Sequence, residues 1–357
     1  EVALTGSALS YCDYDQDGDI DLFLGGRTVP RRYGEIPDSY LLKNNGKGKF
    51  EDVTDQVEGL RNIGMLRSAE WGDIDGNGKP DLVLAGEWMP LSIFLNQGGK
   101  LTQIKPKGLE QSHGWWNTIK LVDIDKDGDL DILGGNLGLN SKLKADSEHP
   151  LRLAVRDFDQ NGSLDQLLLH HWQGEERLFA TKDELGKQLV ALNKKFVSYR
   201  DYSKASFKEI IDPVEFAQAA ILQAYELRSC LFLNDGQGVF MKQVLPQSLQ
   251  ISTLQSFTLH DMNGDGLEDI FAFGNFHEIN IQMGRYDASY GHLLWNRKGG
   301  QLEASKNREI NLYAEGQVRR SRKLRYQNRW LLILARNNDA LSFIALDSDE
   351  QVPSLSK

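Results

Sequence analysis

Short apolar runs recur along the chain, and each follows a segment that is rich in aspartate and contains glycine. The runs cover residues 22–24, 82–84, 132–133, 167–169 and 270–272, which is the length of strands rather than helices. Asn-Gly turns also divide pairs of strand-like runs, as in β-hairpins, within residues 40–53, 94–101, 232–240 and 294–302. One unit is therefore four antiparallel strands, roughly 50 residues long, which is typical of a β-propeller blade.

This repetition predicts an all-β fold, a β-propeller of about six four-stranded antiparallel blades, complete or part of a ring of about seven or eight. We expect residues 1–357 to form one such propeller. After residue 302 the pattern offers three more strands, at residues 322–326, 330–335 and 341–346. Residues 2–5 could supply a fourth strand and close the ring. An incomplete ring is the alternative.

Residues 181–227 have a different period and predict a helical insertion. Thr181 and Glu184 have the spacing of a capping box, and Asp212-Pro213 has the form of a second helix start. The aspartate segment at residue 157 begins only 34 positions after the one at residue 123. That interval is too short for a blade, so we expect this segment in the outer hairpin of the third blade.

The aspartate segments are five copies of a nine-residue loop, with oxygen-bearing side chains at positions 1, 3, 5 and 9 and glycine at position 6. Ca²⁺ takes 6 to 8 oxygen ligands, and glycine permits the sharp turn around it. The residue at position 7 would bind through its carbonyl. The predicted calcium ligands are Asp13, Asp15, Asp17, Asp19 and Asp21; Asp73, Asp75, Asn77, Lys79 and Asp81; Asp123, Asp125, Asp127, Asp129 and Asp131; Asp157, Asp159, Asn161, Ser163 and Asp165; and Asp261, Asn263, Asp265, Leu267 and Asp269.

An EF-hand is the obvious rival, because its loop begins in the same way. That motif needs a glutamate at position 12 and flanking helices. Position 12 here is Leu24, Leu84, Gly134, Leu168 and Ala272. We therefore expect the loops to lie between strands. A metal-free turn is the alternative for any single copy, and five copies in register favour metal.

Charge and composition exclude some classes of partner. The chain has 41 basic and 51 acidic residues, a net charge of −10, which disfavours nucleic acid. Five filled calcium sites would cancel this charge. No apolar run reaches the length of a membrane span. The chain begins with Glu1 rather than methionine, as expected of a processed product. Cys12 and Cys230 could form a disulfide, but the apolar strand around Cys12 favours two buried thiols.

Strand direction places the aspartate loops and the hairpin turns on one face of a propeller. The longer segments 25–39, 86–90, 107–117, 134–149 and 274–291 would then lie on the opposite face. Aromatic rings beside arginine and asparagine suit a sugar or an acidic polymer, although the tryptophans could instead fill gaps between blades. The candidate ligand-binding residues are Arg27, Arg31, Arg32, Tyr33, Trp88, His113, Trp115, Trp116, Asn136, His277, Arg285 and Tyr286.

The loops and the Asn-x-Gly hairpins together resemble the FG-GAP, or VCBS, repeats of integrin-type propellers. More narrowly, residues 23–33, 86–90, 114–117, 135–141 and 284–290 resemble bacterial surface proteins in which such repeats accompany ASPIC/UnbV domains. The resemblance covers nearly the whole chain, and no ASPIC/UnbV domain is visible in it. It implies a place outside the cytoplasm, at the cell surface, on the outer membrane or in the periplasm. Those proteins usually have further blades upstream, which favours a C-terminal fragment.

These observations favour a calcium-stabilised binding or adhesion module for glycan or protein, with its ligand on the face opposite the calcium loops. A polysaccharide lyase or hydrolase on the same face is the alternative, with His113 or His277 as base and Arg27 or Arg285 holding a carboxylate. A scaffold without a small ligand is the third hypothesis. No residue is assigned as catalytic.

Overall fold

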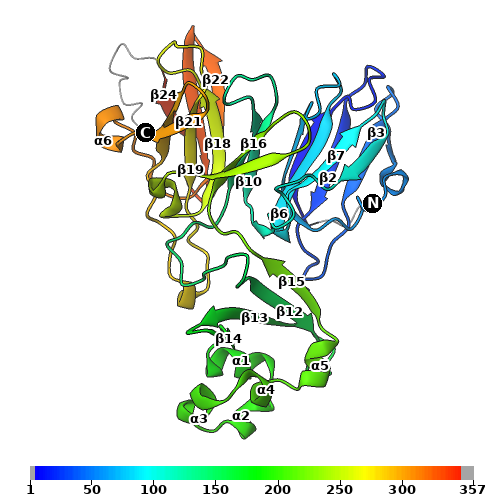
Figure 1. The fold of residues 1–357 in the computed structure, drawn as a ribbon, viewed down its shortest axis with the longest axis vertical. Coiled ribbons are helices and arrows are strands. Elements are labelled where there is room, and N and C mark those ends of the chain that lie inside the picture. The colour runs from blue at the N-terminus through cyan, green and yellow to red at the C-terminus, as the bar shows by residue number, and fades with distance from the viewer. Residues whose placement is uncertain (1–4, 347–357) are drawn as a thin grey trace. The chain divides into compact units, whose positions relative to one another are not determined.

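The computed structural model describes residues 5–346, whose regular structure is mainly antiparallel β-sheet (Figure 1). Four of the six sheets have four strands. One has five, because β9 pairs with β6 beside the path β5-β6-β7-β8, and one has three. The prediction of an all-β fold built from four-stranded, blade-like sheets is confirmed.

The strand bounds follow the sheets. The first sheet contains β1 (Gly6–Cys12), β2 (Asp21–Gly26), β3 (Tyr40–Asn44) and β4 (Phe50–Asp52), and the second contains β5 (Met65–Gly72), β6 (Asp81–Met89), β7 (Ser92–Asn96), β8 (Leu101–Ile104) and β9 (Gly114–Trp115). The third contains β10 (Thr118–Val122), β11 (Asp131–Gly135), β16 (Cys230–Asn234) and β17 (Phe240–Val244). The fourth contains β12 (Leu151–Arg156), β13 (Asp165–Trp172), β14 (Glu175–Leu178) and β15 (Ala220–Ala224). The fifth contains β18 (Leu254–His260), β19 (Asp269–Gly274), β20 (His292–Arg297) and β21 (Gln301–Ala304), and the sixth contains β22 (Val318–Tyr326), β23 (Arg329–Arg336) and β24 (Ser342–Ala345).

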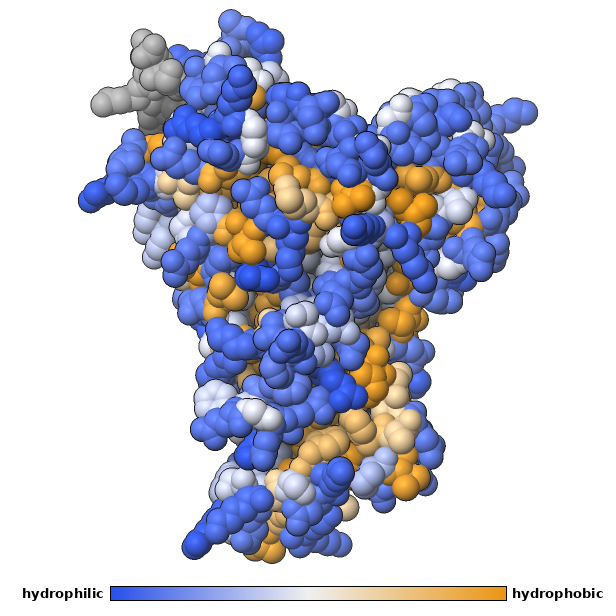
Figure 2. Space-filling view, in the orientation of Figure 1, coloured by the Kyte–Doolittle hydropathy of each residue, from blue (hydrophilic) through white to orange (hydrophobic). Residues whose placement is uncertain are grey.

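Burial explains why the short apolar runs are strands. Every residue of β11 and of β19 is buried, as expected of strands that have a partner on each side and packing on both faces. The outer strand β17 buries only Phe240. The inner strands therefore carry the core of each sheet, and hydrophilic residues cover most of the face shown in Figure 2.

The loop at residues 157–165 lies in a sheet of its own, so its expected place in the third blade is wrong. It joins β12 to β13, whereas the outer hairpin of the third sheet is β16–β17. Strand β11 pairs directly with β16, with Ile132 opposite Phe232. Strands that are consecutive in sequence are usually neighbours in a sheet. Here β12 to β15 and five helices separate β11 from its partner β16 in the sequence, so the pairing could not be predicted.

Five short helices lie between β14 and β15. They are α1 (Lys182–Gln188), α2 (Leu192–Lys195), α3 (Tyr199–Lys204), α4 (Phe207–Ile210) and α5 (Pro213–Ala217). Both expected helix starts are present: α1 follows Thr181, and the Asp212 carboxylate accepts the Val214 N–H at 2.7 Å at the start of α5. Leu185, Leu189 and Ile211 pack on the apolar residues of β12 and β13, so the helices cover one face of this sheet. Helix α6 (Asn307–Ile310) and the 3₁₀ helices Thr54–Gln56, Gln247–Gln250 and Ile281–Met283 lie in connections.

The chain divides into two compact units. The first comprises the chain up to Trp71, Lys79–Trp115 and Leu143–Leu227. The second comprises Gly72–Gly78, Trp116–Lys142 and the chain from Arg228 onward. That residues 1–357 form one propeller stays a prediction. The expected helical insertion at residues 181–227 contains the five helices, but its last part includes strand β15, which pairs with β12.

Three smaller expectations concern the ends and the composition. Residues 2–4 of the expected closing strand lie outside the described residues. Cys12 and Cys230, both within the described residues, are not joined by a disulfide; Cys230 is buried and Cys12 half-buried. Within residues 5–346, no helix is long and apolar enough to cross a membrane.

Candidate functional site

The five aspartate loops share one internal hydrogen-bond frame. We number them first (residues 13–21), second (73–81), third (123–131), fourth (157–165) and fifth (261–269). In the first loop the Asp13 carboxylate accepts the N–H groups of Asp17 and Gly18, both at 3.0 Å. The fourth and fifth loops repeat both bonds. Position 1 therefore closes each loop around its centre.

The glycine at position 6 is required by this turn. Its φ is +97° in Gly18, +104° in Gly128 and +84° in Gly266, a left-handed conformation that side chains with a Cβ rarely adopt. The structure therefore shows the sharp turn for which glycine at position 6 was expected.

The aspartate at position 9 lies buried at the end of each loop. One oxygen accepts the N–H of position 2, at 3.0 Å from Ile124 to Asp131 and from Phe158 to Asp165. Burial raises the pKa of Asp131 to about 7 and also raises that of Asp165. A nearby cation would favour the charged form of these groups.

A hairpin asparagine holds the other oxygen of position 9, and the sequence analysis missed this residue. The backbone N–H of Asn234 donates to Asp131 Oδ1 at 2.8 Å, and its side-chain amide donates to the carbonyl of Ile74, in the loop before, at 3.0 Å. Asn296 likewise joins Asp269 to the carbonyl of Ile124. The signal was present in the sequence as the recurring Asn-x-Gly turn. The four equivalent residues are Asn44, Asn96, Asn234 and Asn296.

Carboxylate oxygens converge in the first, third and fourth loops. One oxygen from each of three residues lies within 4.8 Å of the others in each of the groups Asp13-Asp15-Asp17, Asp123-Asp125-Asp127 and Asp157-Asp159-Asp165. The buried Asp15 Oδ1 of the first loop and Asp125 Oδ1 of the third have no hydrogen-bond partner among the described residues. A buried carboxylate oxygen without a partner is costly, and a bound cation would supply one. These loops fit a metal ion with oxygen ligands.

The second loop begins in one unit and ends in the other, and its position-1 and position-9 aspartates are bonded as in the other loops. Asp73 accepts the N–H of Asn77 and of Gly78, and Asp81 accepts the N–H of Asn96. In the fifth loop, Asp261, Asp265 and Asp269 do not form such a group among the described carboxylates. At position 7, Asp19, Asp129 and Ser163 donate their N–H groups to the position-5 side chain, while Lys79 and Leu267 complete the set of predicted carbonyl ligands.

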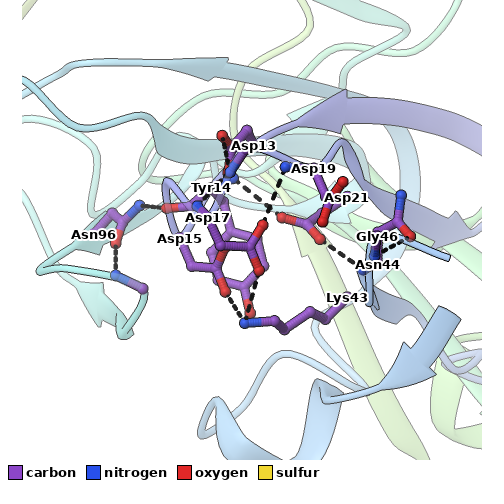
Figure 3. A network of polar contacts seen from close by, with 12 residues as sticks. Asp13, Tyr14, Asp15, Asp17, Asp19, Asp21, Lys43, Asn44, Gly46 and Asn96 are labelled. Carbon is purple, nitrogen blue, oxygen red and sulfur yellow. Dashed lines mark hydrogen bonds and ion pairs between the residues drawn. The ribbon is translucent and has the colours of Figure 1, made fainter.

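In the first loop, a lysine of the neighbouring hairpin contacts the loop aspartates. The Lys43 ammonium pairs with Asp15 Oδ2 and lies 3.3 Å from Asp17 Oδ2 (Figure 3). The hydrogen bond to Asp15 raises the pKa of Lys43. Figure 3 also shows Asn44 beside Asp21 and Asn96 beside Tyr14, the two bonds of the hairpin asparagines at this loop.

In the first unit, several of the candidate ligand-binding residues surround Glu87, which the sequence analysis did not select. Tyr33 donates its hydroxyl to Glu87 at 2.7 Å and accepts the Trp88 indole N–H at 2.9 Å. Burial of the hydroxyl, with the Glu87 charge, raises the pKa of Tyr33 well above its ordinary value. Arg27 lies 3.6 Å from Glu87, and Trp115 packs edge-on against Trp88 with ring centroids 5.0 Å apart. The structure brings these residues together.

Other candidates of the first unit lie apart from this network. Arg31 is exposed, and Arg32 forms an ion pair with Glu35. His113 lines a cavity of about 320 Å³ formed by Pro90, Leu91, Ser92, Gln103, Ile104, Lys105, Pro106, Leu109 and Glu110. Burial lowers the pKa of His113, so its ring is neutral at pH 7.

In the second unit, three candidates are interior residues. Trp116 and Asn136 are fully buried, and Tyr286 is only 2% exposed. Trp116 packs against Phe232, as the gap-filling alternative for the tryptophans expects. Because they are buried, these three residues do not belong to a ligand-binding surface, contrary to the prediction. His277 and Arg285 contact each other at 2.8 Å, and burial with the Arg285 charge lowers the pKa of His277.

A comparison with protein families agrees with the repeated loops and hairpins. A family model described as FG-GAP-like repeat matches residues 13–84 and 73–134. The chain is similar in structure to an Agrocybe aegerita lectin solved for specific recognition of non-reducing terminal N-acetylglucosamine, at 14% identity and TM-score 0.32 over 97% of this chain and 81% of the lectin. It is also similar to the V. cholerae biofilm matrix protein Bap1, at 9% identity and TM-score 0.32 over 92% of this chain and 65% of that one.

No curated protein matches the sequence. The family match begins at Asp13, at the start of the first loop, and ends at Gly134, inside the strand that follows the third. It therefore falls on the loops, strands and hairpins whose hydrogen-bond frame is described above. Residues 13–134 of the chain are FG-GAP-like repeats.

Proposed function

We propose that the protein is a calcium-stabilised binding module that works outside the cytoplasm and takes a glycan or protein ligand. The observation that carries the calcium part is the buried Asp125 Oδ1, which has no partner inside a loop otherwise held by hydrogen bonds. The FG-GAP-like repeats over residues 13–134 support the same proposal.

Calcium suits these loops better than a transition metal. Their ligands are carboxylate, amide and carbonyl oxygens, and no histidine or cysteine lies within the five loops. Hard oxygen ligands favour Ca²⁺ or Mg²⁺, and the flexible spacing of nine residues favours the larger ion. The loops are open, which suits the calcium concentrations outside cells.

The cavity in the first unit is the proposed ligand site. It lies between the β6–β7 connection and the segment after β8, away from the aspartate loops of that sheet. Pro90, Leu91 and Pro106 offer an apolar wall, while Gln103, Lys105 and His113 offer polar groups. Such a combination suits a sugar ring, which has an apolar face and hydroxyl edges.

Calcium titration by isothermal calorimetry tests the metal part. Asp125→Ala removes one carboxylate from the third loop and is expected to abolish one tight equivalent of calcium. Glu58→Ala, which removes an exposed carboxylate outside the loops, serves as control and should leave the count unchanged. Absence of calcium binding to the wild-type chain would contradict the proposal.

A glycan array followed by NMR titration tests the ligand part. Lys105→Ala and His113→Ala should weaken binding of the selected glycan, whereas Arg285→Ala in the second unit should not. Equal binding by all four proteins would remove the cavity from the proposal. Turnover of the glycan by the wild type, lost in His113→Ala, would favour the enzyme hypothesis.

A further inference from the structure

The first and third loops form a matched pair. Both have aspartate at positions 1, 3, 5, 7 and 9 and glycine at position 6. Both have the position-9 aspartate held by a hairpin asparagine, at 2.7 Å from Asn44 to Asp21 and at 2.8 Å from Asn234 to Asp131. The nine residues differ at positions 2, 4 and 8, and their one difference in charge is the exposed Lys126 at position 4 of the third loop, where the first loop has Gln16. The groups around the two loops also differ.

One such group differs in charge. The residue before the hairpin asparagine is Lys43 in the first sheet, but Leu95, Leu233 and Trp295 in the second, third and fifth sheets. The asparagine N–H is hydrogen-bonded to the position-9 aspartate. This bond holds the residue before the asparagine next to the loop. Among these four sheets, the first alone has an ammonium group at this point of the repeat.

The Lys43 ammonium contacts two predicted ligand positions at once. It pairs with Asp15 at position 3 and lies 3.3 Å from Asp17 at position 5 (Figure 3). The Asp15 side chain is only 12% exposed, so water screens this pair less than a surface ion pair. In the third sheet, Leu233 brings no charge to Asp125 and Asp127.

We propose that Lys43 is a built-in cation of the first loop, which competes with calcium for Asp15 and Asp17. The inference rests on the proposed calcium binding. A divalent ion in this loop must displace the ammonium or lie within a few ångströms of it, and either costs free energy. The first loop is thus a weaker calcium site than the third, because Lys43 already offsets part of its carboxylate charge when no ion is bound.

Calcium titrations of variants test this inference, with native mass spectrometry to count bound ions. Lys43→Leu gives the first sheet the residue that the second and third sheets have, and it should tighten one site by at least about tenfold. Lys49→Leu makes the same charge change on the same hairpin at an exposed position and should have no such effect. Adding Asp15→Asn to Lys43→Leu should abolish the gain, which assigns it to the first loop.

The reciprocal change tests the same mechanism at the third loop. Leu233→Lys should weaken one tight site, and its folding is checked by the unfolding temperature in chelator, where the new ammonium is expected to raise stability. Conversely, Lys43→Leu should lower the unfolding temperature in chelator and recover when calcium is added.

These titrations distinguish a failure of the role assigned to Lys43 from a failure of the proposed calcium binding. Unchanged affinities in both Lys43→Leu and Leu233→Lys, with calcium still bound, would overturn the role of Lys43 and leave the calcium proposal standing. Absence of calcium binding in every variant would overturn the proposed function, and the competition with it.

Discussion

At the scale of single residues, the hairpin asparagines Asn234 and Asn296 each connect the position-9 aspartate of one loop to a backbone carbonyl of another loop. Asn296 is fully buried, and its side-chain amide donates to the Ile124 carbonyl at 2.8 Å. Asn296→Ala would leave that carbonyl without its donor in the interior. We expect a loss of about 1–3 kcal/mol in the free energy of unfolding, measured by denaturant titration. Asn62→Ala, which removes an exposed amide bonded to Asp38, should cost much less, and an equal loss would contradict the role assigned to Asn296.

The burial of His292 makes the free energy of unfolding depend on pH. It is 6% exposed, its Nε2 lies 3.1 Å from the Ser289 hydroxyl, and burial lowers its pKa to about 4. Unfolding exposes the ring, whose pKa then returns to about 6.5. Stability is therefore full above pH 6.5 and falls as the pH drops toward 4, by about 2 kcal/mol at pH 5.

Chemical unfolding at pH 7.5 and pH 5 measures this loss. In His292→Gln, the part of the loss that belongs to the imidazole should disappear, although the variant starts from a lower stability. If the wild type and His292→Gln differ in free energy of unfolding by the same amount at pH 7.5 and at pH 5, the role assigned to His292 is contradicted.

At the scale of elements, the loop turn depends on glycine. Gly128 has φ +104°, so Gly128→Ala should destabilise the protein by about 1–3 kcal/mol through backbone strain and weaken calcium binding to the third loop. Lys126→Ala, in the same loop, is the control. Thermal unfolding with and without calcium separates the two effects, and a variant as stable as wild type would show that the turn is not constrained.

The sequence predicted these elements wherever they are local. Asp13 to Asp21 can be assigned from spacing alone, because one short segment contains every group of the loop, and the hairpins follow from their Asn-Gly turns. The partner of β11 could not be assigned, since β16 lies beyond β12 to β15 and the helices α1 to α5. The contact of Lys43 with Asp15 was missed for a similar reason: the two residues are 28 positions apart and meet only when the hairpin folds beside the loop.

At the scale of the whole molecule, acidic charge is concentrated in the loops. The net charge is −10, and mutual repulsion of loop carboxylates opposes folding unless cations are present. Calcium that binds only the folded state raises its stability by mass action. The account therefore predicts a protein whose stability follows calcium concentration rather than ionic strength.

Scanning calorimetry of the wild-type chain tests this most directly, in calcium, in chelator, and in magnesium or sodium salts matched in ionic strength. We expect the unfolding temperature to rise with calcium, to fall on chelation, and to respond much less to the matched salts. The same unfolding temperature in calcium and in chelator would contradict the account, because the aspartate loops would then be turns held by their own hydrogen bonds.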